Sequence, residues 1–529
     1  MTNKRLWRVG AGVVLAVAAL ACNNDKITDL NKNPNSPEDV PPGPLFTDAS
    51  RVEVSRWFGG AYDLRTTEWI VQHLSEVQYN DEDRYVRIHA SDTEGSFNGA
   101  YSAELKDLTQ IIAKATAANE PGSYAPANAL RTLGFMYLTD SWGDIPYSSA
   151  LKGDEVGASL SPTYDKQQDI YTDFFAVLDK AAKDLTGASN TLGGADPIYA
   201  GNPAKWQKFA NSLRARLAMR IVNVAPALAS TQLAAAMAAP GGLILTNADN
   251  AVFPWPGDGV YNNPWSSSLG GRDDWRMSNR LMDQLTSLND PRTPIYAQPT
   301  VDPNAPRYAG SPNGILPNKA VPYFTTTSRP GAIFYAGKTT YGPVFGGTGQ
   351  KLPTFVLTAA EMNFILAEAA ERGMAGLTPA QAAGYYNAGI TASLQQWSAV
   401  APASQQISAT AIAAYLAQPS VAYKGGVAGQ VQIAQQKWIA LFTDGGTAWA
   451  EWRRTCVPTT VVAGVDATQT SVPRRLEYPT LENTVNADAV QAAVADQGAD
   501  NLATRVWWDK APTAAPTYPG ASCGVQNGT

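Results

Sequence analysis

Histidine and cysteine are scarce in this chain, which holds two histidines and three cysteines among its 529 residues. His73 and His89 are too far apart for the H-E-x-x-H zinc motif, which places two histidines on one face of a helix. Neither histidine lies near a cysteine in the sequence. We therefore expect no metal site and no cofactor.

Motifs of nucleophilic and phosphate chemistry are also missing. Residues 520–524 match the letters of the G-x-S-x-G nucleophile elbow, but no helix can follow them at the chain end and both histidines precede them. Residues 346–351 resemble a phosphate loop without its required spacing. We therefore expect that the protein is not an enzyme. A carboxylate pair for glycoside hydrolysis stays open as an alternative, because 46 acidic residues offer many pairs.

Blocks of lysine and arginine are absent as well, and the formal net charge is −6. An acidic chain without a basic patch argues against nucleic acid or an anionic membrane face as its partner. The hydrophobic share of 44% over this length is enough for one large core or two ordinary ones.

A long apolar run occurs at the N-terminus, where Lys4, Arg5 and Arg8 precede a stretch rich in Ala, Val and Leu over residues 9–21. This is the layout of a secretory signal. The run is too short to cross a bilayer, which takes roughly 20 apolar residues. We predict a signal peptide over residues 1–21 that is removed on export.

The signal ends in Ala19-Leu20-Ala21-Cys22, which resembles the lipobox of bacterial lipoproteins, although Ala19 stands where leucine is usual. We predict lipidation of Cys22, with a polar tether over residues 22–45 between the lipid and the folded body. The alternative is an ordinary signal that leaves Cys22 as a free thiol.

The two remaining cysteines are Cys456 and Cys523. In an oxidising compartment they could form a disulfide. They could equally remain two thiols, and the sequence leaves this open.

Much of the chain shows the apolar periodicity of helices, with spacings of three and four residues. Asn202 can cap a helix that has Pro203 at its first position, and Gly373 and Thr378 can end and open two others. The predicted helices cover residues 127–138, 164–185, 203–217, 359–372 and 379–397.

Three of these helices carry a spacing similar to the W-x2-L-G-x2-Y pattern of tetratricopeptide units. The first copy has Leu130, Leu133, Gly134 and Tyr137, and weaker copies begin at Trp206 and Asn363. The copies do not recur at a fixed period, so we expect helix hairpins separated by insertions rather than a regular solenoid. Any helix that packs on another needs small residues, which remains the alternative reading. Trp206 and Phe209 should lie in the core.

The longest insertion spans residues 241–350 and is rich in Gly, Pro, Asn and Tyr, which is typical of functional loops. Trp255, Tyr261, Trp265 and Trp275 alternate there with amides, carboxylates and Arg272. Aromatic faces beside polar groups suit sugar binding, and they suit an extended peptide equally well. We expect at least one of these tryptophans to face a ligand. The alternative is that the rings fix the loop onto the helices.

A second candidate patch lies between Tyr79 and Tyr85 and contains Arg84 beside three acidic residues. If the tryptophans of the insertion prove to be loop packing, the ligand site should be sought here.

Motifs along the whole mature chain together resemble the SusD/RagB-like outer-membrane lipoproteins. They are Asn-Pro-Asn at 33–35, Trp-Gly-Asp-Ile-Pro-Tyr at 142–147, Asn-Asp-Pro-Arg at 289–292, the helix at 361–371, Ala-Trp-Ala-Glu-Trp-Arg-Arg at 448–454, Pro-Arg-Arg-Leu at 473–476 with Pro479, and Val-Trp-Trp-Asp at 506–509.

This resemblance implies an all-α, mostly helical fold of tetratricopeptide-like hairpins, with a loop-rich, irregular ligand-binding half and minor β-hairpins. One domain would span residues 46–529, with its helical scaffold mainly at 100–240 and 355–455 and its variable insertion at 241–350. The resemblance further implies a lipid-anchored protein on the cell surface of a Gram-negative outer membrane. It would deliver oligosaccharides, or in some members peptides, to a SusC-like TonB-dependent β-barrel transporter. The rival interpretations are a surface glycosidase and a protein-binding scaffold.

Overall fold

The structure, a computed structural model, describes residues 40–86, 90–153, 155, 157–270, 272–337, 349–510 and 523. The predicted signal peptide, Cys22, His89 and most of the predicted tether lie outside the described residues. The first described helix begins at Pro42, within the last residues of the range predicted as a tether. Across the described ranges, no helix combines the length and the apolar character needed to cross a membrane.

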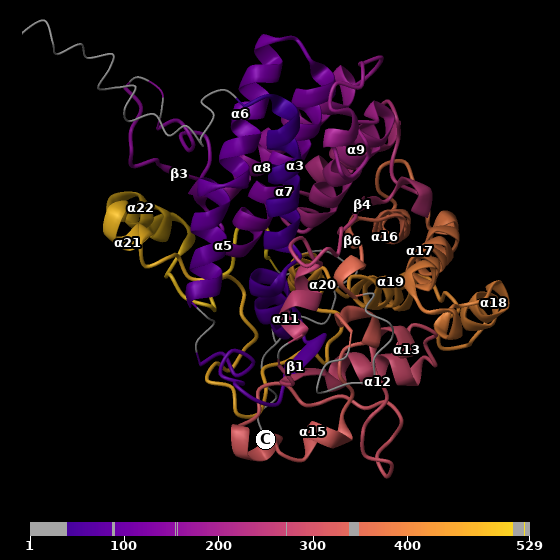
Figure 1. Ribbon diagram of the computed structural model, residues 1–529. Helices are drawn as coiled ribbons and strands as arrows, with labels where there is room; N and C mark the ends of the chain where they lie inside the picture. The colour runs from indigo at the N-terminus through magenta and orange to yellow at the C-terminus, as the bar shows by residue number, and fades with distance from the viewer. Residues whose placement is uncertain are drawn as a thin grey trace, which may run out of the picture.

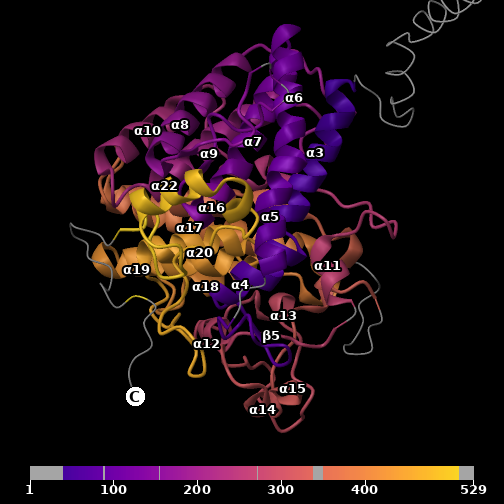
Figure 2. The same ribbon diagram turned by 90° about the vertical axis from the view of Figure 1, so that its left-hand side faces the viewer.

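Helices dominate the described chain and pack as successive hairpins (Figures 1 and 2). The upper half in Figure 1 consists of α3 (Pro42–Trp57), α5 (Ala90–Ser102), α6 (Glu104–Ala117), α7 (Pro121–Trp142), α8 (Gln167–Asp184), α9 (Pro203–Arg220) and α10 (Pro226–Ala238). From α6 to α10 each helix packs against the next one in the chain.

A second group of helices continues this scaffold. It contains α16 (Ala359–Glu371), α17 (Pro379–Val400), α18 (Ala409–Leu416), α19 (Gly426–Ala440) and α20 (Gly445–Thr455). Helix α16 packs against α9 as well as against α17 and α19, so it joins the two groups. The predicted mostly helical fold with tetratricopeptide-like hairpins is confirmed.

Local sequence signals set several helix ends. The Asn202 side chain accepts a hydrogen bond from the Lys205 amide at 3.3 Å, as predicted for the cap of α9. Thr378 and Gln381 form a capping box at the start of α17. Several predicted boundaries are wrong. Helix α7 extends beyond residues 127–138 at both ends, and α9 and α17 end later than predicted, at Arg220 and Val400. Residues 164–165 form a strand ahead of α8 because they pair with residues 145–146.

Small residues allow the hairpins to approach closely, as at Gly134 of α7. A Cβ atom there would lie 2.8 Å from the Glu53 carboxyl and 3.0 Å from Leu105, which belong to α3 and α6. At Gly389 of α17, a Cβ atom would lie 2.9 Å from the ring of Phe364 in α16. A larger side chain at either position would push two helices apart.

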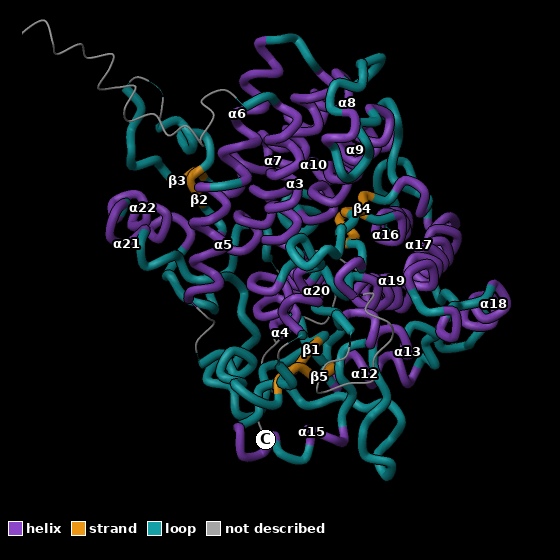
Figure 3. Tube along the Cα trace, in the orientation of Figure 1, coloured by secondary structure: helices purple, strands orange, loops and turns teal. Residues whose placement is uncertain are grey.

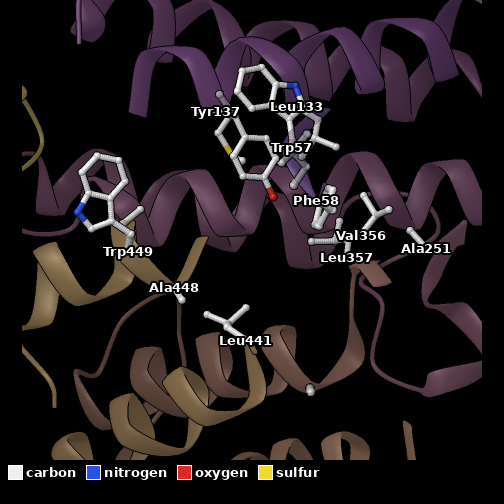
Figure 4. Packing of buried hydrophobic residues seen from close by; sticks show 14 of the residues in the cluster. Trp57, Phe58, Leu133, Tyr137, Ala251, Val356, Leu357, Leu441, Ala448 and Trp449 are labelled. Atoms are coloured by element: carbon white, nitrogen blue, oxygen red, sulfur yellow. The ribbon is translucent and has the colours of Figure 1, made fainter. Parts of the chain in front are cut away.

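One large hydrophobic cluster runs through both helix groups, and Figure 4 shows part of it. Trp57 of α3 stacks on Tyr137 of α7 with ring centres 5.4 Å apart, and Trp449 of α20 is also fully buried. Trp206 and Phe209 of α9 are both 0% exposed, which confirms their predicted place in the core.

Buried ion pairs link α20 to the other helices. Arg454 of α20 contacts Glu368 of α16 and Glu451 of its own helix, each at 2.6 Å. Glu451 also contacts Lys437 of α19 at 3.0 Å and Arg220 of α9 at 3.3 Å. The motif at residues 448–454 therefore ties α20 to three other helices, α9, α16 and α19, through charged groups in the interior.

Three two-stranded antiparallel sheets complete the fold: β1 (Leu74–Glu76) with β5 (Trp275–Met277), β2 (Ile145–Pro146) with β3 (Tyr164–Asp165), and β4 (Ala251–Phe253) with β6 (Thr354–Leu357). In the first of them Leu74 pairs with Met277 and Glu76 with Trp275.

Loops gather in the lower half in Figure 3, around β1 and β5, where the remaining elements are short. These elements are a π-helix at Gly60–Thr67, α4 (Glu68–Ile70), α11 (Pro264–Leu269), α12 (Asn279–Ser287), α13 (Thr293–Tyr296), α14 (Pro317–Ala320) and α15 (Tyr323–Thr326); α21 (Glu482–Val485) and α22 (Ala487–Gln497) lie beside α5. Short 3₁₀ turns occur at Gly193–Ala195, Asn247–Asp249, Ala332–Phe334, Gly349–Lys351 and Ala403–Gln405.

Cys456 and Cys523 form a disulfide, with Cα atoms 5.5 Å apart. The bond ties the end of α20 to the C-terminal region of the chain. Of the two states that the sequence leaves open, the structure contains the bridged one.

Candidate functional site

The predicted ligand-binding residues differ widely in exposure. Tyr79 is 64% exposed and Tyr261 is 47% exposed. Buried members of the set are Trp255, Trp265, Trp275 and Tyr85, with exposures of 5%, 2%, 2% and 2%. In the ligand-free protein none of these three tryptophans presents an open ring, and the expectation that at least one of them faces a ligand stays a prediction.

Trp255 and Trp265 fix the insertion onto the helical body. The Trp255 indole N–H donates to Thr354 Oγ1 at 2.9 Å, and its ring packs on Phe253. The Trp265 indole N–H donates to Asp63 Oδ2 at 2.8 Å. Both rings can be buried because their apolar faces pack against other side chains and their only donor, the indole N–H, is hydrogen-bonded inside the protein.

Tyr261 lies apart from these rings, at the tip of an exposed turn. Its ring lies under the guanidinium of Arg51, 5.3 Å from the ring centre, and its amide donates to Asp258 at 2.7 Å.

The segment between Tyr79 and Tyr85 folds back onto β1. Asp83 is fully buried and accepts hydrogen bonds from the Glu76 amide at 3.2 Å and from Asn313 at 2.8 Å. Burial raises the pKa of Asp83 to about 6 even though these donors favour its charged form. Asp83 thus holds the segment in a fixed shape.

Arg84 and Tyr85 anchor the end of this segment instead of facing a ligand. The Arg84 guanidinium donates to the Asp466 carbonyl at 3.2 Å, and the Tyr85 carbonyl accepts from Thr468 at 2.6 Å. Both contacts bind the segment to residues far along the chain, and the predicted role of Arg84 and Tyr85 in ligand binding stays a prediction.

Tyr79 points outward from this anchored segment. Its φ is 57°, in the left-handed region that bulky residues rarely adopt. Such backbone is retained only where its surroundings impose it, and it clusters at ligand sites. The anchored turn therefore holds the Tyr79 ring in solvent.

Pairing of β1 with β5 brings the two candidate patches together. Tyr79 follows β1 and Arg272 precedes β5, and the Arg272 guanidinium lies 5.0 Å from the centre of the Tyr79 ring. In the sequence the two patches look like alternative sites, because no local signal indicates a strand pairing across about 200 residues.

A cleft of about 360 Å³ opens where these elements meet, and we name it the Tyr79 cleft. It is lined by Arg65 of the π-helix, Trp69 of α4, Glu76 of β1, Tyr79 and Glu82 of the anchored segment, and Arg272. Glu82 belongs to the predicted patch between Tyr79 and Tyr85, whereas Arg65, Trp69 and Glu76 were missed as site residues because their sequence neighbourhoods carry no motif.

The polar groups of the Tyr79 cleft include a buried carboxyl, Glu76, and a cationic guanidinium, Arg272. Burial, followed by the carboxyls of Asp274 and Glu82, raises the pKa of Glu76 well above its usual range. Arg272 forms an ion pair with Asp274 and lies 3.6 Å from Glu76. A neutral Glu76 can donate a hydrogen bond, which an ionised carboxylate cannot.

A larger cavity, of about 490 Å³, lies between the start of α8 and the end of α22. Four of its charged groups pair with one another: Lys166 contacts Asp496 at 2.6 Å, and Arg505 contacts Asp509 at 3.0 Å. We favour the Tyr79 cleft because it combines an exposed aromatic ring with polar groups.

The helical scaffold with its loop-rich half and aromatic cleft defines a binding protein of the SusD type. The profile of a SusD-like family described as "Starch-binding associating with outer membrane" matches residues 34–479. The chain therefore belongs to this family of outer-membrane-associated, glycan-binding proteins.

Solved structures of similar fold span nearly the whole chain. A chitin-binding protein has a TM-score of 0.75 at 27% identity, over 88% of this chain and 99% of its own. A chitin-binding SusD homolog from Flavobacterium johnsoniae has a TM-score of 0.72 at 27% identity, over 88% and 97%. A SusD homolog from Bacteroides uniformis has a TM-score of 0.70 at 26% identity, over 88% and 99%. No curated protein matches the chain.

Proposed function

We propose that this protein captures an uncharged oligosaccharide in the Tyr79 cleft and passes it to a SusC-like TonB-dependent transporter. The observation that carries the proposal is Tyr79, which is 64% exposed beside a cleft lined by polar groups. A pyranose has an apolar face that stacks on such a ring, and hydroxyls that need fixed polar partners. The names of two similar structures, both chitin-binding, make N-acetylglucosamine oligomers the first ligands to test.

The proposal is capture without hydrolysis. Glycosidases hold their two carboxyls about 5–9.5 Å apart, to leave room for the sugar carbon or a water. Glu76 of the Tyr79 cleft has the Asp274 carboxyl as its charged neighbour and shares the Arg272 guanidinium with it. Incubation with chitohexaose or maltohexaose should therefore give binding without new reducing ends. Steady turnover would support a surface glycosidase instead.

Replacing Tyr79→Ala should weaken binding of the preferred hexasaccharide by about ten-fold, since one stacking ring contributes roughly 1–2 kcal/mol. Isothermal titration calorimetry measures this loss. The urea midpoint of unfolding should change little, because an exposed ring leaves no cavity when it is removed.

Tyr261→Ala is the matched comparison, since Tyr261 is also an exposed tyrosine but does not line the cleft. Full binding by Tyr79→Ala together with loss in Tyr261→Ala would move the site to the turn at Tyr261. Full binding by both variants would contradict glycan capture by either exposed ring.

Membrane attachment is proposed to rest on lipid at Cys22. Cys22→Ser should leave the folded domain intact and move it from the membrane fraction to the soluble fraction, because the lipid supplies the anchor. The measurement is immunoblotting of fractions from cells that lack the partner transporter. Unchanged retention of the variant in the membrane fraction would contradict the lipid anchor.

The proposed partner is tested separately from the ligand. Co-purification with a TonB-dependent barrel from the outer membrane of the native cells would support delivery to a transporter. A stable complex with that barrel, without binding of any glycan or peptide, would favour the protein-binding scaffold.

A further inference from the structure

Arg272, which lines the Tyr79 cleft, covers two aromatic rings: Tyr79 of the cleft and the buried Trp275. Its guanidinium carbon lies over the Tyr79 ring at 5.0 Å and over the Trp275 ring at 4.9 Å from the ring centres. One cationic side chain therefore occupies positions above both aromatic faces, where a sugar ring would otherwise stack.

Several buried polar groups at and around Arg272 lack hydrogen-bond partners. Within the described residues, the indole N–H groups of Trp69 and Trp275 and the Nε–H of Arg272 are buried and donate no hydrogen bond. Neither carboxyl oxygen of Glu76 accepts a hydrogen bond from a described donor. Buried polar groups are normally paired, so this concentration around one cleft indicates groups that a ligand would satisfy.

Arg272 is partly open to solvent. Its side chain is 38% exposed, whereas its ion-pair partner Asp274, just before β5, is 1% exposed. Glu76 lies 3.6 Å away, and burial raises the pKa of its carboxyl well above the usual range, which favours the uncharged form. Cation–π contacts at partly exposed sites are individually small.

We propose that Arg272 is a displaceable plug, and that a hexopyranose unit of the ligand replaces its guanidinium over Tyr79 and Trp275. The inference rests on the proposed capture of glycan in the Tyr79 cleft, and it adds that Arg272 covers the stacking surface until the ligand binds. Trp275 is then a ligand-stacking ring that is covered in the free protein. Trp69, Trp275 and Glu76 offer their unpaired groups to the hydroxyl or acetamido groups of the same sugar.

The first experiment needs no glycan. Mild oxidation with N-bromosuccinimide, followed by peptide mass mapping, reports which tryptophans reagents can reach. In Arg272→Ala, Trp275 should be oxidised at least several-fold faster than in the wild type, whereas the core residue Trp206 stays protected in both. Equal protection of Trp275 in the two proteins would overturn the plug.

The second experiment measures affinity for chitohexaose and maltohexaose by calorimetry. Arg272→Ala should bind the preferred oligosaccharide about ten-fold more tightly, because the ligand no longer competes with the guanidinium. Arg51→Ala is the matched control: it also removes an arginine from an exposed tyrosine, but outside the cleft, and affinity should not change. Equal or weaker binding by Arg272→Ala would show that Arg272 is a ligand contact or a bystander.

The two proposals fail in different ways. If Tyr79→Ala loses binding while Arg272→Ala also weakens it, capture in the cleft stands and the plug is overturned. If Tyr79→Ala binds both oligosaccharides like the wild type, capture in this cleft is overturned, whatever Arg272→Ala does. Faster oxidation of Trp275 in Arg272→Ala would then show only that Arg272 covers the ring.

Discussion

Replacing Arg454→Met is expected to lower the free energy of unfolding by about 3–5 kcal/mol at pH 7, because it leaves buried carboxylates without their main cation. Arg454 is 1% exposed and binds Glu368 through both guanidinium NH₂ groups, at 2.7 and 2.6 Å. It also contacts Glu451 at 2.6 Å. Urea unfolding, monitored by circular dichroism, measures this decrease in the free energy of unfolding.

The effect of Arg454→Met should depend on pH in a defined direction. Burial opposes the ionisation of Glu368, yet Arg454 and Arg372 outweigh it and hold the pKa of Glu368 at about 2. In the unfolded chain a glutamate has a pKa of ~4.3. The stabilisation by Glu368 is therefore fully present above pH 4.3 and disappears as the pH falls toward 2. The difference between wild type and variant should shrink over the same interval.

Arg51→Met provides the matched control for burial. Arg51 and Asp48 have the same spacing and the same 2.6 Å distance as Arg454 and Glu451, but their side chains are 32% and 56% exposed. Removing this surface pair should change stability by at most about 1 kcal/mol. A similar loss in both variants would contradict a special role for the buried network.

Trp206→Ala is expected to lower the free energy of unfolding by about 3–5 kcal/mol, since it opens a cavity inside the helical scaffold. Trp206 is 0% exposed and packs edge-on against Phe46 and Tyr199, with ring centres 5.8 and 5.2 Å apart. Its indole N–H also donates to Asp196 at 2.7 Å. Urea unfolding gives the magnitude.

Trp206→Phe separates the cavity from the lost hydrogen bond. It keeps a ring in the same space and should destabilise the protein clearly less than Trp206→Ala does. Glycan affinity of the folded variants should stay at the wild-type value, because Trp206 does not line the Tyr79 cleft. An unaltered urea midpoint in Trp206→Ala would contradict the packing of α9.

The helical scaffold was largely predictable because its signals are local. The apolar spacing around Leu130 and Trp206 places α7 and α9, and Asn202 with Pro203 fixes where α9 starts. Strand β3 at Tyr164 was missed, since a two-residue pairing with β2 leaves no periodic pattern.

The site was only partly predictable. The sequence drew attention to Tyr79 and Trp275 as aromatic residues among polar neighbours, but it treated them as separate patches. Trp255 and Trp265 have the same kind of neighbours and lie buried, because their environment is set by Thr354 and Asp63, which are distant in sequence. The composition of a loop does not show which of its aromatic rings will pack against the rest of the protein.

The sequence by itself determined the helix-rich class, the family motifs, the core position of Trp206 and the absence of a histidine-based zinc motif. Each follows from residue type or from spacing within about one helix length. Tertiary structure alone decided that β1 pairs with β5, that Arg272 covers Tyr79 and Trp275, and that Cys456 bonds Cys523. These contacts join residues far apart in the chain, so their free energies depend on the packing of the whole fold and leave no local pattern.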